Sequence, residues 1–296
     1  MYDVVIIGAG PAGLSSALYL LRANKKVLLL EAKSYGGQII NAHKVENYPG
    51  IDSISGYDYA TNLYKQVINL GGEIKYEMVT RVNEDKTILT NQNEYHAKAI
   101  IIATGVTNRR LNIANEREFL GKGISYCATC DGNFYKNKDV AVVGGGNTAL
   151  EDALYLSDLA NKVYLIHRRD EFNGEYKYID ELRNKDNVEF IINSTINKII
   201  GDNHVEKIEL INNNNELSTI NVNGLFIAIG QDPKNESFAN IVELDNKGYI
   251  KTIDDVKTKI NGIYVAGDTR VKELRQLTTA VSDGAIAASI AIKEMK

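Results

Sequence analysis

The chain has 296 residues, of which 44% are hydrophobic and 24% charged, and this length predicts about two domains with globular cores. Its formal net charge of -4 argues against a nucleic-acid-binding protein, which would normally carry a basic face. The sequence shows no signal-peptide pattern and no apolar run long enough to span a bilayer, so we expect a cytoplasmic protein without a membrane segment.

The first nucleotide-binding signature occupies residues 2–31. A β-branched run over residues 2–7 predicts a strand, a glycine loop follows, and residues 14–21 predict a helix. A second apolar run over residues 27–30 ends in Glu31. Strand, G-x-G-x-x-G loop, helix, strand and acid in this order are typical of a dinucleotide-binding unit.

Each residue of this signature has a mechanical role. Gly8 permits the tight turn, Gly10 lets the backbone approach a pyrophosphate, and Gly13 lets helix and strand pack closely. The pyrophosphate would lie at the helix N-terminus, where free N–H groups favour an anion. Glu31 stands where a carboxylate holds a ribose diol and would repel a 2′-phosphate. This site should therefore take FAD or NAD rather than NADP.

The following region predicts a loop, a helix and several strands. Turn residues dominate residues 36–50, and residues 57–70 predict a helix that ends before two glycines. Strands are predicted over residues 74–82 and 87–89. Residues 99–105 predict a buried parallel strand that runs into a turn.

The only two cysteines, Cys127 and Cys130, are separated by two residues and followed by Asp131. This is the spacing of a redox-active dithiol. A zinc site would need two more ligands, and the histidines, such as His43 and His96, show no paired spacing. We therefore predict no metal site, and we interpret the cysteines as the point where electrons leave the protein.

A second nucleotide-binding signature follows the cysteines. Residues 139–143 and 163–166 predict strands, residues 144–149 form a G-x-G-x-x-A loop, and residues 150–159 predict a helix. The order of elements matches that of the first signature.

The acidic end of the first signature is cationic in the second. His167, Arg168 and Arg169 stand where the first signature has Glu31. Cations there are what a 2′-phosphate needs, although two arginines in a loop are also compatible with a solvated charge pair. The difference in sign predicts FAD at the first site and NADPH at the second.

The remaining segments predict short strands and a terminal helix. Short antiparallel strands are predicted over residues 188–192, 196–200, 205–211 and 217–222, with a polar turn at residues 212–215. Residues 224–230 predict a strand entering a glycine turn, residues 262–266 a strand ending at Gly267 and Asp268, and residues 278–295 a helix.

The strand before Gly267 is too short to form a domain, so it should complete the first sheet, and the first domain is then split by the second. We predict an α/β fold with two Rossmann-like three-layer nucleotide-binding domains. Residues 1–111 and 238–296 would bind FAD. Residues 112–237, inserted between them, would bind NADPH and carry the dithiol.

Together these pieces resemble the low-molecular-weight thioredoxin reductase family over essentially the whole chain. The cysteine motif with its aspartate is specific, whereas the other motifs are shared with wider flavoprotein relatives. The matching motifs are Gly8-Ala9-Gly10-Pro11-Ala12-Gly13, Gly37-Gln38, Glu46-Asn47-Tyr48-Pro49-Gly50, Ala103-Thr104-Gly105, Cys127-Ala128-Thr129-Cys130-Asp131, His167-Arg168-Arg169, Gly267-Asp268 and Arg275-Gln276.

The resemblance implies a homodimer with FAD in the outer domain, NADPH in the inserted one and thioredoxin as the acceptor. The implied FAD contacts are Gly8, Gly10, Pro11, Ala12, Gly13, Glu31, Gly36, Gly37, Gln38, Asn47, Ala103, Thr104, Gly105, Gly267, Asp268, Arg275, Gln276 and Leu277. The implied NADPH contacts are Gly144, Gly146, Asn147, Thr148, Ala149, His167, Arg168 and Arg169.

The resemblance also implies a mechanism. Hydride passes from NADPH to the flavin, and the reduced flavin attacks the Cys127–Cys130 disulfide. Cys130 is the implied flavin-side sulfur, and Cys127 attacks the disulfide of thioredoxin. Asp131 is placed to supply or relay the proton that the leaving thiolate needs. Since one sulfur must meet both flavin and a protein partner, a rotation of the inserted domain is implied.

Two positions depart from the family pattern and keep other interpretations open. Asn173 stands where a third arginine is usual, and Asn147 where an aspartate is common. NADH or ferredoxin therefore remain alternative donors. The reductase of an alkyl hydroperoxide system shares the core but has an extra dithiol module, and ferredoxin–NADP reductases lack the cysteine pair. From another class, a nucleotide-sensing flavoprotein without turnover remains possible.

Overall fold

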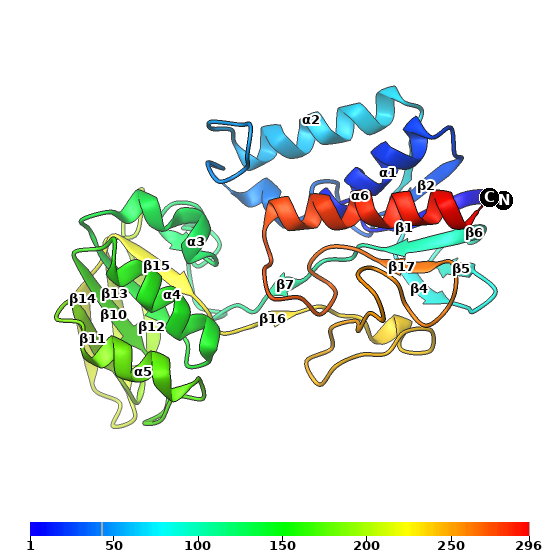
Figure 1. Cartoon of the computed structure of the whole chain (residues 1–296). Coiled ribbons are helices and arrows are strands. Elements are labelled where there is room, and N and C mark those ends of the chain that lie inside the picture. The colour runs from blue at the N-terminus through cyan, green and yellow to red at the C-terminus, as the bar shows by residue number, and fades with distance from the viewer. Residues whose placement is uncertain (43, 296) are drawn as a thin grey trace. The chain divides into compact units, whose positions relative to one another are not determined.

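The computed structural model describes residues 1–42 and 44–295, which divide into two compact units (Figure 1). The first unit is Met1–Thr107 with Asp232–Lys296, and the second is Asn108–Gln231. The chain thus passes between units a few residues before the positions expected from the sequence, residues 111 and 237. The two passing segments, β7 (Thr107–Asn108) and β16 (Gln231–Asp232), pair with each other.

The first unit has a central sheet covered by helices. Its strands are β1 (Tyr2–Ile7), β2 (Val27–Leu30), β3 (Glu73–Lys75), β4 (Val79–Val82), β5 (Thr87–Thr90), β6 (Glu94–Ile102) and β17 (Ile263–Val265). Its helices are α1 (Pro11–Arg22), α2 (Gly56–Asn69) and α6 (Leu277–Glu294), with 3-10 turns η1 (Gly37–Asn41) and η3 (Glu236–Phe238). The strand order is β3-β2-β1-β6-β5-β4, and β17 also pairs with β6, in parallel. The C-terminal strand therefore completes this sheet, as expected.

Alternate residues of β1 point to opposite faces of the sheet, because side chains alternate along a strand. Val4 and Ile6 pack in the core that contains residues of α1, α2 and α6. Val5 and Ile7 pack in a second core with residues of the β4–β5 hairpin and the segment after η3. All four side chains are buried, so the strand is apolar throughout, which is typical of a central parallel strand.

The strand predicted over residues 74–82 is wrong, because β3 and β4 lie at opposite edges of the sheet. The carboxylate of Glu77 is buried in the break between them. It accepts hydrogen bonds from Thr90 Oγ1 (2.6 Å), Asn93 Nδ2 (2.9 Å) and Tyr95 Oη (2.7 Å). A buried carboxylate needs such partners, and reaching them takes the chain out of a continuous strand.

The second unit has three layers. Its parallel sheet, in the order β11-β10-β9-β15-β8, lies between helices on one face and an antiparallel sheet on the other. The parallel strands are β8 (Ile124–Ser125), β9 (Asp139–Val143), β10 (Lys162–Ile166), β11 (Val188–Ile191) and β15 (Gly224–Ile227). The antiparallel strands are β12 (Ser194–Ile200), β13 (Lys207–Asn212) and β14 (Leu217–Asn221). The helical segments are α3 (Ala128–Asp131), η2 (Gly132–Tyr135), α4 (Asn147–Ser157) and α5 (Tyr176–Arg183).

Both units thus have the predicted α/β class, with a mainly parallel sheet between two covering layers. Two local predictions fail in the second unit. Strand β11, expected to be antiparallel, pairs in parallel with β10, because strand propensity does not specify a partner. Helix α5, which buries Ile179 and Leu182, has no counterpart among the predicted elements. None of the helices in the described residues combines the length and apolar character that a bilayer crossing requires.

Helices α1 and α6 pack unusually closely in the first unit. A Cβ on Gly284 of α6 would lie 2.2 Å from the carbonyl oxygen of Ala12 in α1. The hydroxyl of Ser15 donates to the carbonyl oxygen of Val281 at 2.8 Å, and Ser16 Oγ lies 3.1 Å from the carbonyl oxygen of Gly284. Small residues on both helices therefore allow backbone groups to meet across the contact.

We expect Gly284→Ala to destabilise the protein, although the same change in an exposed helix stabilises by about 1 kcal/mol. The added methyl must displace a backbone carbonyl, and such overpacking costs about 1–3 kcal/mol. Urea unfolding of the purified variants measures the difference. Ser282→Ala, at an exposed position of the same helix, is the control and should be neutral or slightly stabilising. A Gly284→Ala protein as stable as the Ser282→Ala protein would contradict the packing described above.

Candidate functional site

The first glycine loop joins β1 to α1 and is tightly packed at two of its three glycines. Gly8 has a φ of +107°, and a Cβ there would lie 2.3 Å from the carbonyl oxygen of Ala103. A Cβ on Gly13 would lie 1.9 Å from the carbonyl oxygen of Gly8. A Cβ on Gly10 would have Gly37 Cα as its nearest neighbour, at 3.9 Å. Packing therefore requires Gly8 and Gly13, whereas Gly10 leaves the N-terminus of α1 open to an anion.

Glu31 follows β2 and turns its carboxylate to the same loop. Its Oε2 accepts the backbone N–H of Ala9 at 2.8 Å, and its Oε1 accepts that of Lys33 at 2.8 Å. These two bonds fix the carboxylate beside the glycines. A carboxylate oxygen accepts more than one hydrogen bond, so a ribose diol can still bind there.

The segment after Glu31 lies against the glycine loop. Gly36 and Gly37 both have positive φ, and the N–H of Gly36 donates to the carbonyl oxygen of Ala9 at 2.8 Å. Gln38 Nε2 donates to the carbonyl oxygen of Val106 at 2.5 Å. These contacts bring the segment from residues 36–38 next to the ends of β1 and β6.

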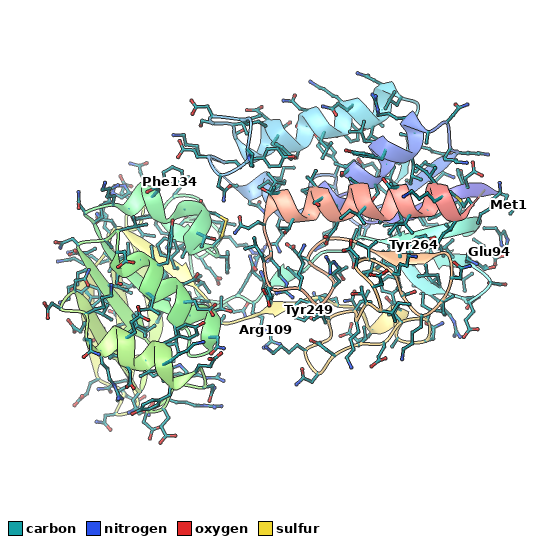
Figure 2. The ribbon with its side chains drawn as sticks, viewed as in Figure 1. Met1, Glu94, Arg109, Phe134, Tyr249 and Tyr264 are labelled. Atoms are coloured by element: carbon teal, nitrogen blue, oxygen red, sulfur yellow. A yellow bond between two sulfur atoms is a disulfide. The ribbon has the colours of Figure 1, made fainter. Side chains whose placement is uncertain are left out.

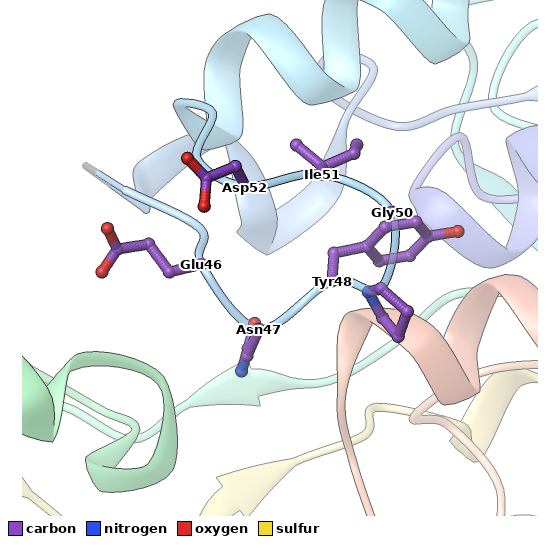
Figure 3. Close-up of a pocket in the computed structure, with 7 residues that line it drawn as sticks. Glu46, Asn47, Tyr48, Gly50, Ile51 and Asp52 are labelled. Carbon is purple, nitrogen blue, oxygen red and sulfur yellow. The ribbon is translucent and has the colours of Figure 1, made fainter.

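Asn47 lies in a loop that borders a hollow of about 430 Å³ (Figure 3). Its Nδ2 donates to Gln276 Oε1 at 3.1 Å, which links this loop to the start of α6. The hollow is lined by Glu46, Asn47, Tyr48, Pro49, Gly50, Ile51 and Asp52.

The start of α6 is held by Arg275 and Gln276. The guanidinium of Arg275 stacks on the ring of Tyr249, with 4.2 Å between its carbon and the ring centroid; Figure 2 labels the tyrosine. It also lies 3.4 Å from the carbonyl oxygens of Asp268 and Arg270. Gln276 caps the helix, and Leu277 is its first residue.

Asp268 has a carboxylate oxygen that is suited to a ligand. Its Oδ1 is buried and has no hydrogen-bond partner in the described part of the chain. Burial raises the pKa of this carboxyl, and the nearby Lys272 and Arg275 charges oppose the rise. A buried acceptor without a donor is costly, so this atom fits a ligand hydroxyl placed beside the Gly267 turn.

The turn at Gly267 is fastened by Asp283, a residue that no sequence motif indicated. The Asp283 carboxylate is buried and accepts the N–H of Gly267 at 3.0 Å. It also accepts Arg270 Nε at 2.8 Å and Lys272 Nζ at 3.0 Å. Despite burial, these donors hold the pKa of Asp283 below its usual value.

A polar network ties the end of β6 to the same turn. Thr104 Oγ1 lies 3.0 Å from Thr269 Oγ1 and 3.3 Å from Asn235 Oδ1. Asn235 is fully buried and also donates to the carbonyl oxygens of Gly248 and Thr269. The segments at residues 103–105 and 267–269, which are far apart in sequence, are thereby placed side by side.

The second glycine loop repeats the packing of the first. A Cβ on Gly144 would lie 2.4 Å from the carbonyl oxygen of Ala228, and one on Gly146 would meet nothing within 4 Å. Thr148 lies in the first turn of α4, and Ala149 is fully buried against the loop. Gly146 thus leaves the start of α4 open, as Gly10 does for α1.

His167 packs against the second glycine loop and does not contribute a positive charge to it. A Cβ on Gly145 would lie 2.0 Å from the His167 ring, which stacks on Phe172 with centroids 4.9 Å apart. Burial lowers the pKa of His167, so the ring is neutral near pH 7. Arg168 and Arg169 are exposed, and the cationic character of this strand end rests on them.

The two residues that depart from the family pattern lie at the same loop. Asn147 Oδ1 accepts the N–H of Glu175 at 2.7 Å, and its Nδ2 donates to Glu175 Oε1 at 3.0 Å. The N–H of Asn173 donates to the carbonyl oxygen of Gly145 at 2.7 Å, while its side chain is exposed. Asn147 therefore serves to hold the segment that contains Asn173.

The dithiol lies between β8 and η2 of the second unit. Cys127 and Cys130 form a disulfide with an S–S distance of 2.10 Å. Cys127 caps the single turn α3, and its sulfur accepts the N–H of Cys130 at 3.2 Å. Asp131 ends this turn and accepts the hydroxyl of Ser125 at 2.6 Å. Both sulfurs and the carboxylate are thus held by one short segment.

The predicted contacts fall into two groups by unit. Every predicted FAD residue lies in the first unit, after the carboxyl ends of β1, β2, β6 and β17 or at the start of α1 and α6. The predicted NADPH residues and the dithiol lie in the second unit. His43 lies outside the described residues, and His96 contacts Thr87 and Glu94 on the surface. Residues 1–42 and 44–295 contain no group of three or more side chains suited to a metal ion.

Comparison with known proteins places these features in a family. Residues 2–284 match the family "Pyridine nucleotide-disulphide oxidoreductase". The chain is 42% identical to a thioredoxin reductase of Listeria monocytogenes over 99% of this chain and 93% of that protein. It is also 40% identical to a thioredoxin reductase of Bacillus subtilis, over 97% of this chain and 93% of that protein. The structure of a thioredoxin reductase from Streptococcus pyogenes superposes with a TM-score of 0.96 at 39% identity, covering 100% of this chain and 98% of that one. With its glycine loops, buried Asp268 and Cys127–Cys130 disulfide, the chain therefore belongs to the thioredoxin reductases of the pyridine nucleotide-disulphide oxidoreductase family.

Proposed function

We propose that the protein is a thioredoxin-disulfide reductase that passes electrons from NADPH through FAD and the Cys127–Cys130 disulfide to thioredoxin. The disulfide itself carries this proposal, because it contains both cysteines of the chain and lies at the start of a short helical turn next to a carboxylate. This disulfide can be reduced and re-formed without changing any other bond between cysteines, because the chain has only these two.

The residues of the first unit fit FAD. The open backbone at Gly10 suits a pyrophosphate, Glu31 suits a ribose diol, and the unpaired Asp268 Oδ1 suits a ribityl hydroxyl. Bound there, FAD would accept two electrons as hydride and deliver them to a disulfide. The remaining contacts would come from the segments after β2 and β6 and from the start of α6, which the contacts described above bring to this loop.

In the exchange with thioredoxin, the Cys127 thiolate attacks one sulfur of the substrate disulfide, and the other substrate sulfur leaves as a thiolate. Cys130 then attacks the Cys127 sulfur, which re-forms the enzyme disulfide and releases the second substrate sulfur. Counting the proton that Cys127 releases when it forms its thiolate, the enzyme dithiol loses two electrons and two protons, and the two substrate sulfurs gain them. Asp131 can carry a proton between the two pairs of sulfurs.

We infer that NADPH rather than NADH is the donor. Arg168 and Arg169 are exposed after the end of β10, and the preceding residue, His167, packs against Gly145 in the loop before α4. Two guanidinium groups there suit a 2′-phosphate. Asn173 provides no such charge, so the preference for NADPH rests on two arginines.

We further infer a homodimer and a cytoplasmic location. The homodimer rests on the family resemblance. The location is supported by cysteine use: both cysteines belong to the redox pair, so the chain has no structural disulfide of the kind that secreted proteins use.

The roles of the two sulfurs can be separated by trapping. In Cys130→Ser, Cys127 can attack thioredoxin but no second thiol resolves the adduct, so a stable mixed disulfide should accumulate on a non-reducing gel. Cys127→Ser should form none. Both variants should keep a flavin that NADPH bleaches. Trapping by Cys127→Ser alone would reverse the roles, and unimpaired thioredoxin reduction by both variants would exclude the dithiol route.

Anaerobic flavin bleaching with NADPH and NADH tests the donor. Arg168→Ala and Arg169→Ala should each weaken the response to NADPH about tenfold or more and leave NADH nearly unaffected, because each removes a charge-assisted bond of about 1.5–3 kcal/mol. Asn173→Arg should strengthen the response to NADPH. Arg183→Ala, an exposed arginine of α5, is the control. Equal losses with both nucleotides would contradict 2′-phosphate recognition, and bleaching by dithionite alone would point to another donor such as ferredoxin.

Asp268→Ala and Asp283→Ala should have opposite effects on the flavin-free protein. Removing Asp268, whose Oδ1 has no hydrogen-bond partner among the described residues, should raise the Tm of the protein. Removing Asp283 takes away the carboxylate that pairs with the largely buried Arg270 and Lys272 side chains, and should lower the Tm. Because burial raises the pKa of Asp268, its ionisation opposes folding, and the gain should shrink at low pH where the group is protonated in both states. Asp268→Ala should also bind FAD about tenfold or more weakly. A lower Tm for flavin-free Asp268→Ala would contradict the assignment.

A further inference from the structure

Ser125 connects the dithiol segment to Asp131 through its hydroxyl. It lies in β8 and is 4% exposed. The N–H of Cys127 donates to Ser125 Oγ at 3.0 Å, and the hydroxyl lies 2.6 Å from Asp131 Oδ2 and 3.3 Å from the carbonyl oxygen of Cys127. One buried side chain thus touches the backbone of one redox cysteine and the carboxylate beside the other.

The distances decide how this hydroxyl is used. A serine hydroxyl has one proton, and the Cys127 N–H already occupies one of its lone pairs. The proton therefore goes to the nearer acceptor, Asp131 Oδ2. A separation of 2.6 Å is in the range of O–H···O⁻ bonds, which are shorter and stronger than neutral ones. The bond favours the ionised form of the carboxylate and fixes its direction.

We propose that Ser125 is a positioning residue for thiol–disulfide exchange, which holds the Asp131 carboxylate ionised and beside the dithiol so that it can take up and hand on a proton. The proposal rests on the function proposed above. When Cys130 closes the disulfide, its thiol proton passes to Asp131 and then to the sulfur that leaves the substrate. All groups involved lie within residues 125–131, so this link does not depend on how the two units are placed.

Two neighbouring elements carry other titratable groups. Tyr135 in η2 has its pKa raised to about 12, chiefly by burial and further by the Asp131 charge, so it stays protonated. Helix α4 packs against α3 and carries Glu151 and Asp152, and burial raises the pKa of Asp152 to about 7. Because Asp152 can also titrate in the range of the assay, the experiment has to show which pH-dependent changes arise from Asp131.

The experiment measures the rate at which the full-length, pre-reduced enzyme reduces a bacterial thioredoxin in a single turnover, as a function of pH. Ser125→Ala should lower the rate about tenfold and move the acidic midpoint to higher pH, because the carboxylate loses a donor to its ionised form. Ser125→Thr, which keeps the hydroxyl, should restore both. Ser157→Ala removes another buried hydroxyl of the same unit, bonded to the carbonyl oxygen of Leu154, and should change neither.

A double-mutant cycle with Asp131→Asn assigns the effect. In that background Ser125→Ala should cause no further change, since the two residues act as one unit. The proposal would be overturned if Ser125→Ala left the acidic midpoint of the rate unmoved, or lowered the rate equally in the wild-type and Asp131→Asn backgrounds. Should the alanine variant fail to fold, Ser125→Gly provides the same comparison. The small disulfide DTNB serves as a second acceptor. Failure of the wild type with thioredoxin but not DTNB would refute the proposed function, and the cycle measured with DTNB would still decide the role of Ser125.

Discussion

Both units depend on one steric constraint: the close approach of a glycine to the carbonyl oxygen at the end of the neighbouring strand. A Cβ on Gly8 would meet Ala103, and one on Gly144 would meet Ala228, at nearly the same separation, 2.3 and 2.4 Å. This contact draws the end of the adjacent parallel strand against the loop. A Cβ on the second glycine of each motif would meet nothing closer than 3.9 Å, at Gly10, or 4 Å, at Gly146, and both glycines lie at a helix N-terminus. The same packing thus leaves a helix N-terminus accessible in each unit, where we propose that a pyrophosphate binds.

Local sequence patterns predict most of the helices and strands, but they do not predict several of the tertiary contacts that these elements make. The strand–glycine–helix segments are readable because apolar runs and glycine spacing report local geometry. The split of residues 74–82 depends on Glu77 meeting Thr90, Asn93 and Tyr95, which lie later in the chain. The parallel pairing of β11 likewise depends on a distant strand. Predicting such features requires knowledge of tertiary contacts, which the local spacing of apolar residues does not provide.

The candidate site follows the same division. Residues in motifs, such as Cys127 and Cys130, are evident from spacing alone. Ser125 and Asp283 belong to no motif, and their importance is visible only through the donors and acceptors they meet. These contacts also separate two kinds of buried carboxylate. Asp283 has its charge balanced by Arg270 and Lys272, whereas Asp268 keeps an oxygen that has no hydrogen-bond partner within residues 1–42 and 44–295. Asp283 holds the Gly267 turn, and we propose that Asp268 serves a ligand at a cost in stability.

The contact between α1 and α6 joins the first and last helices of the chain, and this has a consequence for synthesis. The ribosome releases residues 108–231 as one continuous stretch, so the second unit can fold while the chain is still growing. The first unit cannot, because β17 and α6 are made last. Until then, the apolar faces of α1 and β6 lack their cover. Until residues 263–294 have been made, the nascent chain therefore exposes part of its own N-terminal core.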